Sequence, residues 1–210
     1  MVARPASMYR PDTRRDLTER LGLPSNALPG AGNWYPEEGV LALLVDLVEA
    51  RDPCEVVVCG SGLSVAVLAR ACQLAGTGPV TSIESDDRAA AVTRRLLNDI
   101  SAEARIIKTE LTQYDKHNLW YARAPLVSLP DRIDLLFLDG PGHFAGRMPR
   151  WPAGPELFPR LSEDGVVVLD DSRRVKEKKA MKHWAVGFPD LVVQKHKRGG
   201  GAALLVRQKG

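Results

Sequence analysis

The sequence predicts an α/β protein with one doubly wound, mostly parallel, seven-stranded sheet and an antiparallel C-terminal hairpin. Short apolar runs rich in valine alternate with segments of helical periodicity, which is the order of a parallel sheet covered on both faces. The 210 residues suit a single domain, and 44% hydrophobic residues are enough for a full core. A glycine-rich link between the last two apolar runs indicates the hairpin.

The expected elements follow from this alternation, taken in chain order. The helix after residue 36 ends at Arg51-Asp52-Pro53, because proline disfavours helical backbone in the residue before it. The link between residues 113 and 131 is poorly periodic, and we expect it to be irregular. We expect helices over residues 14–23, 37–50, from Ser64 onward, 86–100, 155–161 and 175–187. We expect strands over residues 55–59, 80–84, 104–109, 133–138, 166–169, 191–195 and 202–206, with a turn over 162–165 before the fifth.

The first 36 residues carry five prolines and one short predicted helix. We interpret residues 1–36 as an N-terminal arm, which would serve as a lid, as a subunit contact or as padding, and residues 37–210 as the folded domain. A subunit contact through the arm would make the protein a homodimer.

Cysteine usage and hydropathy point to a soluble cytoplasmic protein. Cys54, Cys59 and Cys72 are odd in number, lack metal-type spacing and have apolar neighbours, so we expect all three to be buried and reduced. The longest apolar run, residues 40–48, is interrupted by Asp46 and is too short to span a membrane. The first residues lack an apolar secretory segment.

Charge is unevenly spread, although the net charge is only +3. Residues 172–198 hold nine lysines and arginines against two acids, a local +7, which leaves −4 for the remainder. Such a segment can attract phosphate, carboxylate or nucleic acid. It is also the ordinary composition of a solvated helix face, and we favour that interpretation.

The stretch Glu55-Val-Val-Val-Cys-Gly-Ser-Gly-Leu-Ser64 predicts a ligand site. A strand that turns through glycines into a helix presents free backbone N–H groups at the helix N-terminus, where an anionic or carboxylate-bearing ligand binds. We expect Ser64 to cap that helix. The Gly-x-Gly signal is weak alone, because ordinary tight turns contain it too.

Glycines or carboxylates follow five consecutive predicted strands, and ligands of open α/β sheets bind at this edge. The residues are Gly60-Ser61-Gly62, Glu84-Ser85-Asp86, Glu110, Asp139 and Asp170-Asp171. Each acid has a structural alternative as a helix cap or turn residue. Like charges side by side are costly, however, and three acids pointing into one space favour a hard cation such as Mg²⁺. Glu84, about twenty residues past the glycines, stands where a carboxylate grips ribose hydroxyls in dinucleotide folds.

Two histidines are candidates for proton transfer. His143 lies four residues beyond Asp139 in the same predicted loop, and His117 lies in the link that could fold over the site. Histidine titrates near neutral pH and can accept a proton from a hydroxyl. A lone histidine in a loop is more often a surface residue, so the groups around it decide whether it can act in catalysis. His183 and His196 are interpreted as surface residues.

The order of these motifs resembles the class I S-adenosylmethionine-dependent methyltransferases, over roughly residues 34–206. The first glycine motif and Val80-Thr-Ser-Ile-Glu-Ser-Asp86 resemble their first two motifs. Ile133-Asp-Leu-Leu-Phe-Leu-Asp-Gly140 and Gly165-Val-Val-Val-Leu-Asp-Asp171 resemble the fourth and fifth strands of the O-methyltransferase branch. Leu138-Asp-Gly-Pro-Gly-His143 is similar to bacterial O-methyltransferases that act on sugars.

The resemblance implies a Rossmann-like fold, S-adenosylmethionine and Mg²⁺ as cofactors, and residue roles by position. The cofactor-binding residues would be Trp34, Gly60, Ser61, Gly62, Ser64, Glu84, Ser85, Asp86 and Glu110. The metal ligands would be Asp139, Asp170 and Asp171, as in catechol-type enzymes, and the catalytic residues His143, Asp139 and His117. Val58 replaces an acid that the family often has, so Glu84, Glu110 or the segment 33–35 would have to hold the cofactor's amino group.

We therefore expect a Mg²⁺-dependent O-methyltransferase that acts on a small acceptor, a sugar or oligosaccharide precursor. The alternatives are an RNA methyltransferase that docks through residues 172–198, and a non-catalytic S-adenosylmethionine-binding protein. The first would show steeply salt-dependent affinity, although the basic segment contains only Trp184 and Phe188 as aromatics. A nicotinamide-dependent dehydrogenase is disfavoured, because residues 61–64 lack the third glycine of that fingerprint.

Overall fold

A single seven-stranded sheet forms the centre of the protein in a computed structural model that describes residues 14–29, 35–195 and 201–208. Its strand order is β3-β2-β1-β6-β7-β9-β8. The five strands from β3 to β7 are parallel, and β9 and β8 close the sheet with antiparallel pairing. The predicted fold class is therefore confirmed. The strands are β1 (Val56–Cys59), β2 (Val80–Glu84), β3 (Arg105–Lys108), β6 (Ile133–Leu138), β7 (Leu161–Leu169), β8 (Leu191–Lys195) and β9 (Ala203–Arg207).

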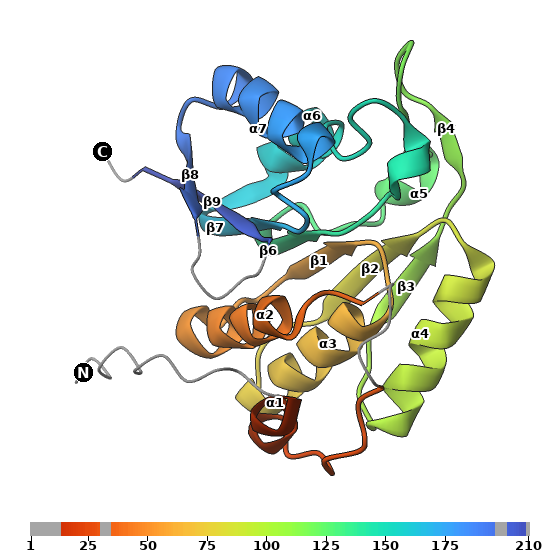
Figure 1. Ribbon diagram of the computed structural model, residues 1–210, viewed down its shortest axis with the longest axis vertical. Helices are drawn as coiled ribbons and strands as arrows, with labels where there is room; N and C mark the ends of the chain where they lie inside the picture. Colours follow the sequence, from red (N-terminus) through yellow and green to blue (C-terminus); the bar gives the residue numbers. More distant parts are fainter. Residues whose placement is uncertain (1–13, 30–34, 196–200, 209–210) are drawn as a thin grey trace.

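Helices cover both faces of the sheet (Figure 1). One face carries α1 (Arg14–Arg20), α2 (Glu38–Arg51), α3 (Leu63–Ala75) and α4 (Asp87–Asp99). The other carries α5 (Arg123–Leu126), α6 (Ala153–Leu157) and α7 (Val175–Gly187). Leu17, Leu21 and Leu28 from the N-terminal segment pack into the core cluster on the α2–α3 side.

The apolar runs of the strands divide between two cores. In β1, Val56 and Val58 join the cluster under α2 and α3, whereas Val57 and Cys59 join the cluster under α6 and α7. Successive side chains of a strand point to opposite faces, so a strand buried on both faces needs an unbroken apolar run. The continuous valines of β1 meet this requirement.

The link between β3 and β6 is ordered, contrary to the irregular connection that we expected. Its strands β4 (Leu111–Gln113) and β5 (Leu119–Tyr121) pair antiparallel as a separate small sheet. Trp120 and Tyr121 are buried in the core on the α6–α7 side. Two three-residue strands are too short to leave a periodic signal in the sequence.

Two further expectations about local structure, those for residues 162–165 and for Cys54, are wrong. β7 begins at Leu161, so the turn predicted over 162–165 lies within a strand, where the register with β6 shifts between Ile133 and Leu135. The short helix predicted near 155–161 is confirmed as α6 followed by the 3₁₀ turn η2 (Phe158–Arg160). Cys54 is exposed just before β1, whereas Cys59 and Cys72 are buried as expected.

No helix within the described ranges combines the length and the apolar character needed to cross a membrane.

Candidate active site

The glycine turn after β1 lies directly against the end of β6. The backbone N–H groups of Asp139 and Gly140 both donate to the carbonyl of Cys59, at 3.0 and 2.6 Å. A Cβ on Gly140 would lie 3.0 Å from the Cα of Gly60 and 2.6 Å from the hydroxyl of Tyr121. Gly60 itself has φ +108°, in the region that favours glycine. Only glycines allow the two strand ends to approach this closely.

The start of α3 differs from the cap that we expected at Ser64. The helix begins at Leu63 with Gly62 as its N-cap residue, at φ +94°. The backbone N–H of Gly62 donates to Thr93 Oγ1 at 2.7 Å, which ties the turn to α4. Ser64 is buried one position into the helix, and its hydroxyl has no partner within the part of the chain that the structure describes. The positive φ of the second glycine makes the turn without a side-chain cap.

Glu84 is held at the end of β2 by hydrogen bonds to both carboxylate oxygens. Oε1 accepts from the backbone N–H groups of Ser85 and Asp86, at 2.6 and 2.7 Å. Oε2 accepts from the hydroxyl of Ser61 at 2.5 Å, so the acid is joined to the glycine turn. Only 8% of Glu84 is exposed, and the lone pair left on Oε2 is the one available to a ligand hydroxyl.

The other cofactor candidates lie at the rim of this region. Asp86 is the exposed N-cap residue of α4, and its hydrogen bond from the backbone N–H of Ala89 lowers its pKa below the usual range. Glu110 is exposed after β3. Trp34 lies outside the described residues. The ring of Tyr35 is 3.9 Å from where a Cβ on Gly62 would stand, so Tyr35 itself reaches the glycine turn.

The predicted acid cluster forms at the ends of β6 and β7. One carboxylate oxygen from each of Asp139, Asp170 and Asp171 lies within 4.8 Å of the others. Burial raises the pKa of Asp139 to about 7; Arg150 opposes this shift, and the charges of Asp170 and Asp171 add to it. Burial also raises the pKa of Asp170. Asp171 has φ +54°, a backbone conformation uncommon outside glycine, which turns the chain sharply after β7.

Arg150 enters this cluster, and the sequence reading missed it. Its side chain is 4% exposed, and Nη1 donates to the carbonyl of Asp170 at 2.7 Å. Nη2 donates to the carbonyl of Asp139, to Asp139 Oδ1 at 3.3 Å and to Asp171 Oδ2 at 3.1 Å. Arg174, which is more exposed, also pairs with Asp171 Oδ2, at 2.8 Å. An arginine eleven residues past Asp139 in a proline-rich link carries no pattern that would have indicated this contact.

Tyr121 is a second buried residue that the sequence reading missed. Its hydroxyl sits over Gly140, and its ring packs against Trp120 with centroids 4.9 Å apart. Burial raises its pKa well above the usual 10, with further contributions from Cys59, Glu84 and Asp139. The small sheet of β4 and β5 therefore places a neutral phenol between the glycine turn and the acid cluster.

The two candidate histidines lie outside the acid cluster. Among the described residues the group that could hold a cation contains the three aspartates and neither histidine. His143 is exposed in the 3₁₀ turn η1 (His143–Ala145), and Lys176 Nζ donates to its carbonyl and to that of Gly146, both at 2.7 Å. His117 is exposed between β4 and β5. The carbonyl of His117 accepts from the backbone N–H of Arg147, which ties the two histidine-bearing loops together.

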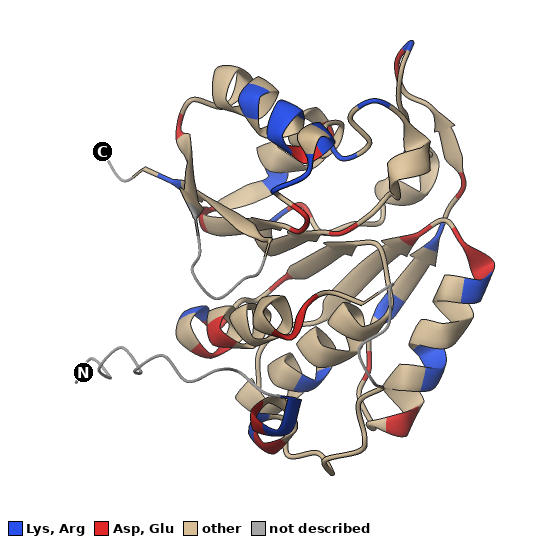
Figure 2. Ribbon diagram, viewed as in Figure 1, with Lys and Arg blue, Asp and Glu red and all other residues tan. Residues whose placement is uncertain are grey.

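The basic segment forms an exposed face on α7, as we favoured. Lys178, Lys179 and Lys182 are exposed there, and the blue stretches on the α7 ribbon in Figure 2 mark its basic residues. Residues 196–198 of the segment lie outside the described ranges.

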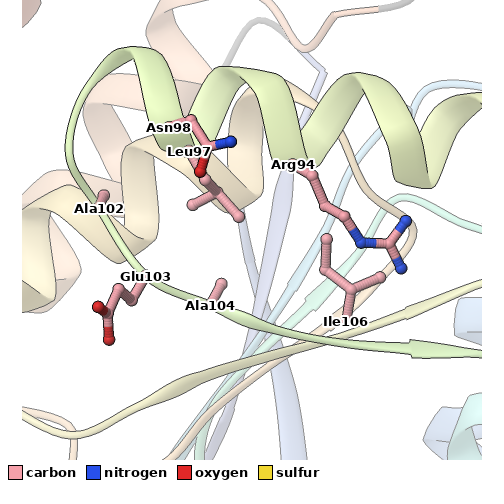
Figure 3. Close-up of a pocket in the computed structure, with 7 residues that line it drawn as sticks. All are labelled: Arg94, Leu97, Asn98, Ala102, Glu103, Ala104 and Ile106. Atoms are coloured by element: carbon pink, nitrogen blue, oxygen red, sulfur yellow. The ribbon is translucent and has the colours of Figure 1, made fainter.

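A separate pocket, drawn in Figure 3, lies between the last turns of α4 and the chain that enters β3. It is therefore at the amino end of β3, away from the strand ends that carry the acids.

Comparison with known proteins assigns the family. Residues 57–172, more than half of the chain, match the family model described as a methyltransferase domain. The chain belongs to this methyltransferase family. The matched range contains the glycine turn, Glu84, both candidate histidines and all three aspartates. A search of curated proteins found no match.

Solved structures share the fold of this methyltransferase at low sequence identity. The methyltransferase PaMTH1 of Podospora anserina, bound to SAH, aligns with TM-score 0.61 and 14% identity over 92% of this chain and 88% of its own. An O-methyltransferase of Bacillus cereus in complex with SAH gives 0.59 and 15% over 92% and 90%. The O-methyltransferase TomG of Streptomyces achromogenes, in complex with SAM, gives 0.56 and 16% over 93% and 87%.

Proposed function

We propose that this methyltransferase transfers a methyl group from S-adenosylmethionine to a hydroxyl of a small acceptor, most suitably a sugar or oligosaccharide precursor. One observation carries the proposal: the glycine turn with Glu84 and the cluster of three aspartates meet at the same edge of the sheet, joined by the contact between Gly60 and Gly140. A donor site and an acceptor site need this proximity. The O-methyltransferases among the structural neighbours, two of them bound to SAM or SAH, support the same class.

The donor would lie across the glycine turn. Glu84 Oε2 retains a lone pair for a ribose hydroxyl, while Ser61 and two backbone N–H groups fix its orientation. Asp86 and Glu110 would border the adenine, and the ring of Tyr35 would lie beside the methionine part at the glycine turn. Bound S-adenosylmethionine would supply an electrophilic methyl group on a sulfonium. The residues of this chain contribute position, because holding two reactants in line removes much of the entropic barrier.

The aspartate cluster fits Mg²⁺ in its donor type. Three carboxylates with oxygens within 4.8 Å are the hard ligands that this ion takes, and Asp139, Asp170 and Asp171 would hold it. Bound Mg²⁺ would act as a Lewis acid and lower the pKa of the acceptor hydroxyl. A sugar hydroxyl needs such help more than a phenol does, because its unassisted pKa is far above neutral.

The proton of the acceptor hydroxyl would pass to His143. Its loop follows Asp139 by a short turn and is fixed to α7 through Lys176, although the imidazole itself is exposed. Phe144 is 71% exposed beside it, with ring centroids 6.4 Å apart, and would offer an aromatic face to the acceptor ring. His117, on the adjoining loop, is the second candidate base. We keep the homodimer through the N-terminal arm as a prediction that light scattering would check.

Isothermal titration with S-adenosylhomocysteine, with and without Mg²⁺, tests this assignment directly. We expect binding in both conditions, since the glycine turn and Glu84 make up the donor site. Methyl transfer from labelled S-adenosylmethionine to a panel of sugars and sugar phosphates would then be Mg²⁺-dependent. Absence of S-adenosylhomocysteine binding by the folded protein would refute the donor assignment. Binding without transfer to any hydroxyl acceptor would refute the acceptor class.

A further inference from the structure

The aspartate cluster already contains a positive charge that belongs to the protein. Arg150 is 4% exposed and contacts both strand ends, so its guanidinium is as much a part of the cluster as the carboxylates are. Three carboxylates face two guanidinium groups, those of Arg150 and Arg174. With every group ionised, one net negative charge remains to attract a cation.

The contacts of Arg150 fall into a strong set and a weak set. Its firm contacts are with backbone carbonyls: Nη1 with Asp170 at 2.7 Å, and Nη2 with Asp139. Its contacts with the carboxylates of Asp139 and Asp171 are longer, at 3.3 and 3.1 Å. Charge-assisted hydrogen bonds are usually 2.7–2.9 Å long. The carbonyls therefore fix the arginine, and the carboxylates are held loosely beside it.

The hydrogen count at Arg150 leads to the same conclusion. Nη2 carries two hydrogens and has three acceptors, the carbonyl and Oδ1 of Asp139 and Oδ2 of Asp171. Its Nε is buried and has no partner among the described residues. The guanidinium thus has fewer hydrogens than acceptors on the side that faces the carboxylates. The carboxylates therefore keep free lone pairs that a metal ion can use.

We propose that Arg150 is a tethered counter-cation: it keeps the ends of β6 and β7 together when no metal is bound, and it weakens the binding of divalent cations by competing for Asp139 and Asp171. The inference rests on the proposed assignment of Mg²⁺ to the three aspartates. Arg150 acts here as a positioning residue. Its fork spans two strand ends, which a single ammonium cannot do.

Mn²⁺ binding measured by the electron paramagnetic resonance signal of the free ion tests the proposal without reference to activity. Arg150→Gln removes the charge, and we expect this variant to bind Mn²⁺ at least about tenfold more tightly than the wild type does. Arg150→Lys keeps the charge and is expected to stay within about threefold of the wild type. Arg174→Gln is the matched control, because Arg174 also pairs with Asp171 but is 57% exposed and screened by solvent. We expect a change of less than about threefold for it.

Thermal unfolding of the same variants gives a second measurement. Metal-free Arg150→Gln should melt below the wild type, and Mn²⁺ should restore its transition, but not that of the double variant Arg150→Gln with Asp139→Asn. If Arg150→Gln folds only with Mn²⁺, the proposal stands. If it does not fold even with Mn²⁺, or if it folds and its Mn²⁺ affinity is unchanged or weaker, the proposal is overturned.

S-adenosylhomocysteine titration of each variant separates this result from the proposed function. Retained S-adenosylhomocysteine binding with unchanged Mn²⁺ affinity would refute the role of Arg150 and leave the methyltransferase assignment intact. Loss of S-adenosylhomocysteine binding in the folded wild type would refute the donor site, whatever the Mn²⁺ result.

Discussion

The two halves of the candidate site satisfy their acids in different ways. On the donor side, Glu84 accepts only from neutral donors, the backbone N–H groups of Ser85 and Asp86 and the hydroxyl of Ser61 in the glycine turn, and no ion pair involves it among the described residues. On the acceptor side, Asp139, Asp170 and Asp171 lie together and are balanced by Arg150 and Arg174. The first arrangement uses neutral hydrogen-bond donors alone, whereas the second balances three carboxylates against two guanidinium groups.

The difference indicates what each half can do. A carboxylate whose oxygens accept N–H and O–H groups is held in one orientation. Its remaining lone pair therefore accepts a hydroxyl from one direction only, which suits recognition of a ribose. A carboxylate cluster balanced by a guanidinium can exchange one cation for another, which suits chemistry at an acceptor oxygen. Substitutions in the two halves should therefore affect different measurements.

The largest effect is expected at Asp139, whose replacement should separate turnover from donor binding. Asp139→Ala removes one proposed metal ligand and one partner of Arg150, so kcat is expected to fall on the order of a thousandfold. Affinity for S-adenosylhomocysteine, measured by calorimetry, should stay within about threefold. Unchanged turnover and unchanged Mg²⁺ dependence would contradict the assignment of the acceptor side.

Gly140→Ala should break the contact that joins the halves. The new Cβ would lie 2.6 Å from the Tyr121 hydroxyl and 3.0 Å from the Cα of Gly60, so the strand ends must separate. We expect a loss of about 2 to 3 kcal/mol in the free energy of unfolding, measured in urea. Gly76→Ala is the control: φ is +68° there but no atom lies within 4 Å, and the expected cost is about 1 kcal/mol. Equal costs would show that sterics at Gly140 are unimportant.

Glu84→Gln tests the proposed role of Glu84 in binding the donor. The amide nitrogen would replace an oxygen that accepts a hydrogen bond, and affinity for S-adenosylhomocysteine should fall about tenfold to a hundredfold. Asp87→Asn is the control, because Asp87 follows on the same segment but its side chain is 90% exposed. Calorimetry of both variants decides the point. An affinity for Glu84→Gln within twofold of the wild type would refute its role.

Lys176→Met tests whether the His143 loop is positioned by α7. Its ammonium donates to the carbonyls of His143 and Gly146, so its loss should loosen the loop and lower kcat by about threefold to tenfold. Lys179→Met, on the exposed face of the same helix, should have no effect. A change confined to stability, with kcat unaltered, would make Lys176 purely structural.

The smallest effect is expected in the pH dependence of stability, because Asp139 is 22% exposed and Arg150 opposes the shift. Burial raises its pKa to about 7 in the folded protein, against the usual 3.8. Between these values the folded state binds more protons than the unfolded state, so stability falls as pH rises from about 4 to 7. Metal-free protein should melt a few degrees lower at pH 7.5 than at pH 5, and Asp139→Asn should flatten this slope. A melting temperature that rises with pH in both proteins would contradict it.

Prediction from the sequence succeeded where local signals are strong. The valine run of β1, the glycine turn and the acids after β2, β6 and β7 were all placed at the correct strand ends, because a strand that must be buried on both faces leaves an unmistakable apolar run. It failed where the conformation of one residue or the exact start of a strand decides the outcome. Ser64 was expected to cap α3, but the conformation of Gly62 starts that helix. Cys54 was expected to be buried, but it lies exposed just ahead of the strand.

The sequence by itself determined the parallel α/β fold, the glycine turn after β1 and the identity of the three clustered aspartates, since periodicity and strand-end chemistry are properties of neighbouring residues. Tertiary structure alone decided that β9 lies between β7 and β8, that Tyr121 covers Gly140, and that Arg150 closes the acid cluster. These features depend on packing between segments far apart in the chain. The role of a buried arginine depends on which charged groups the fold places around it.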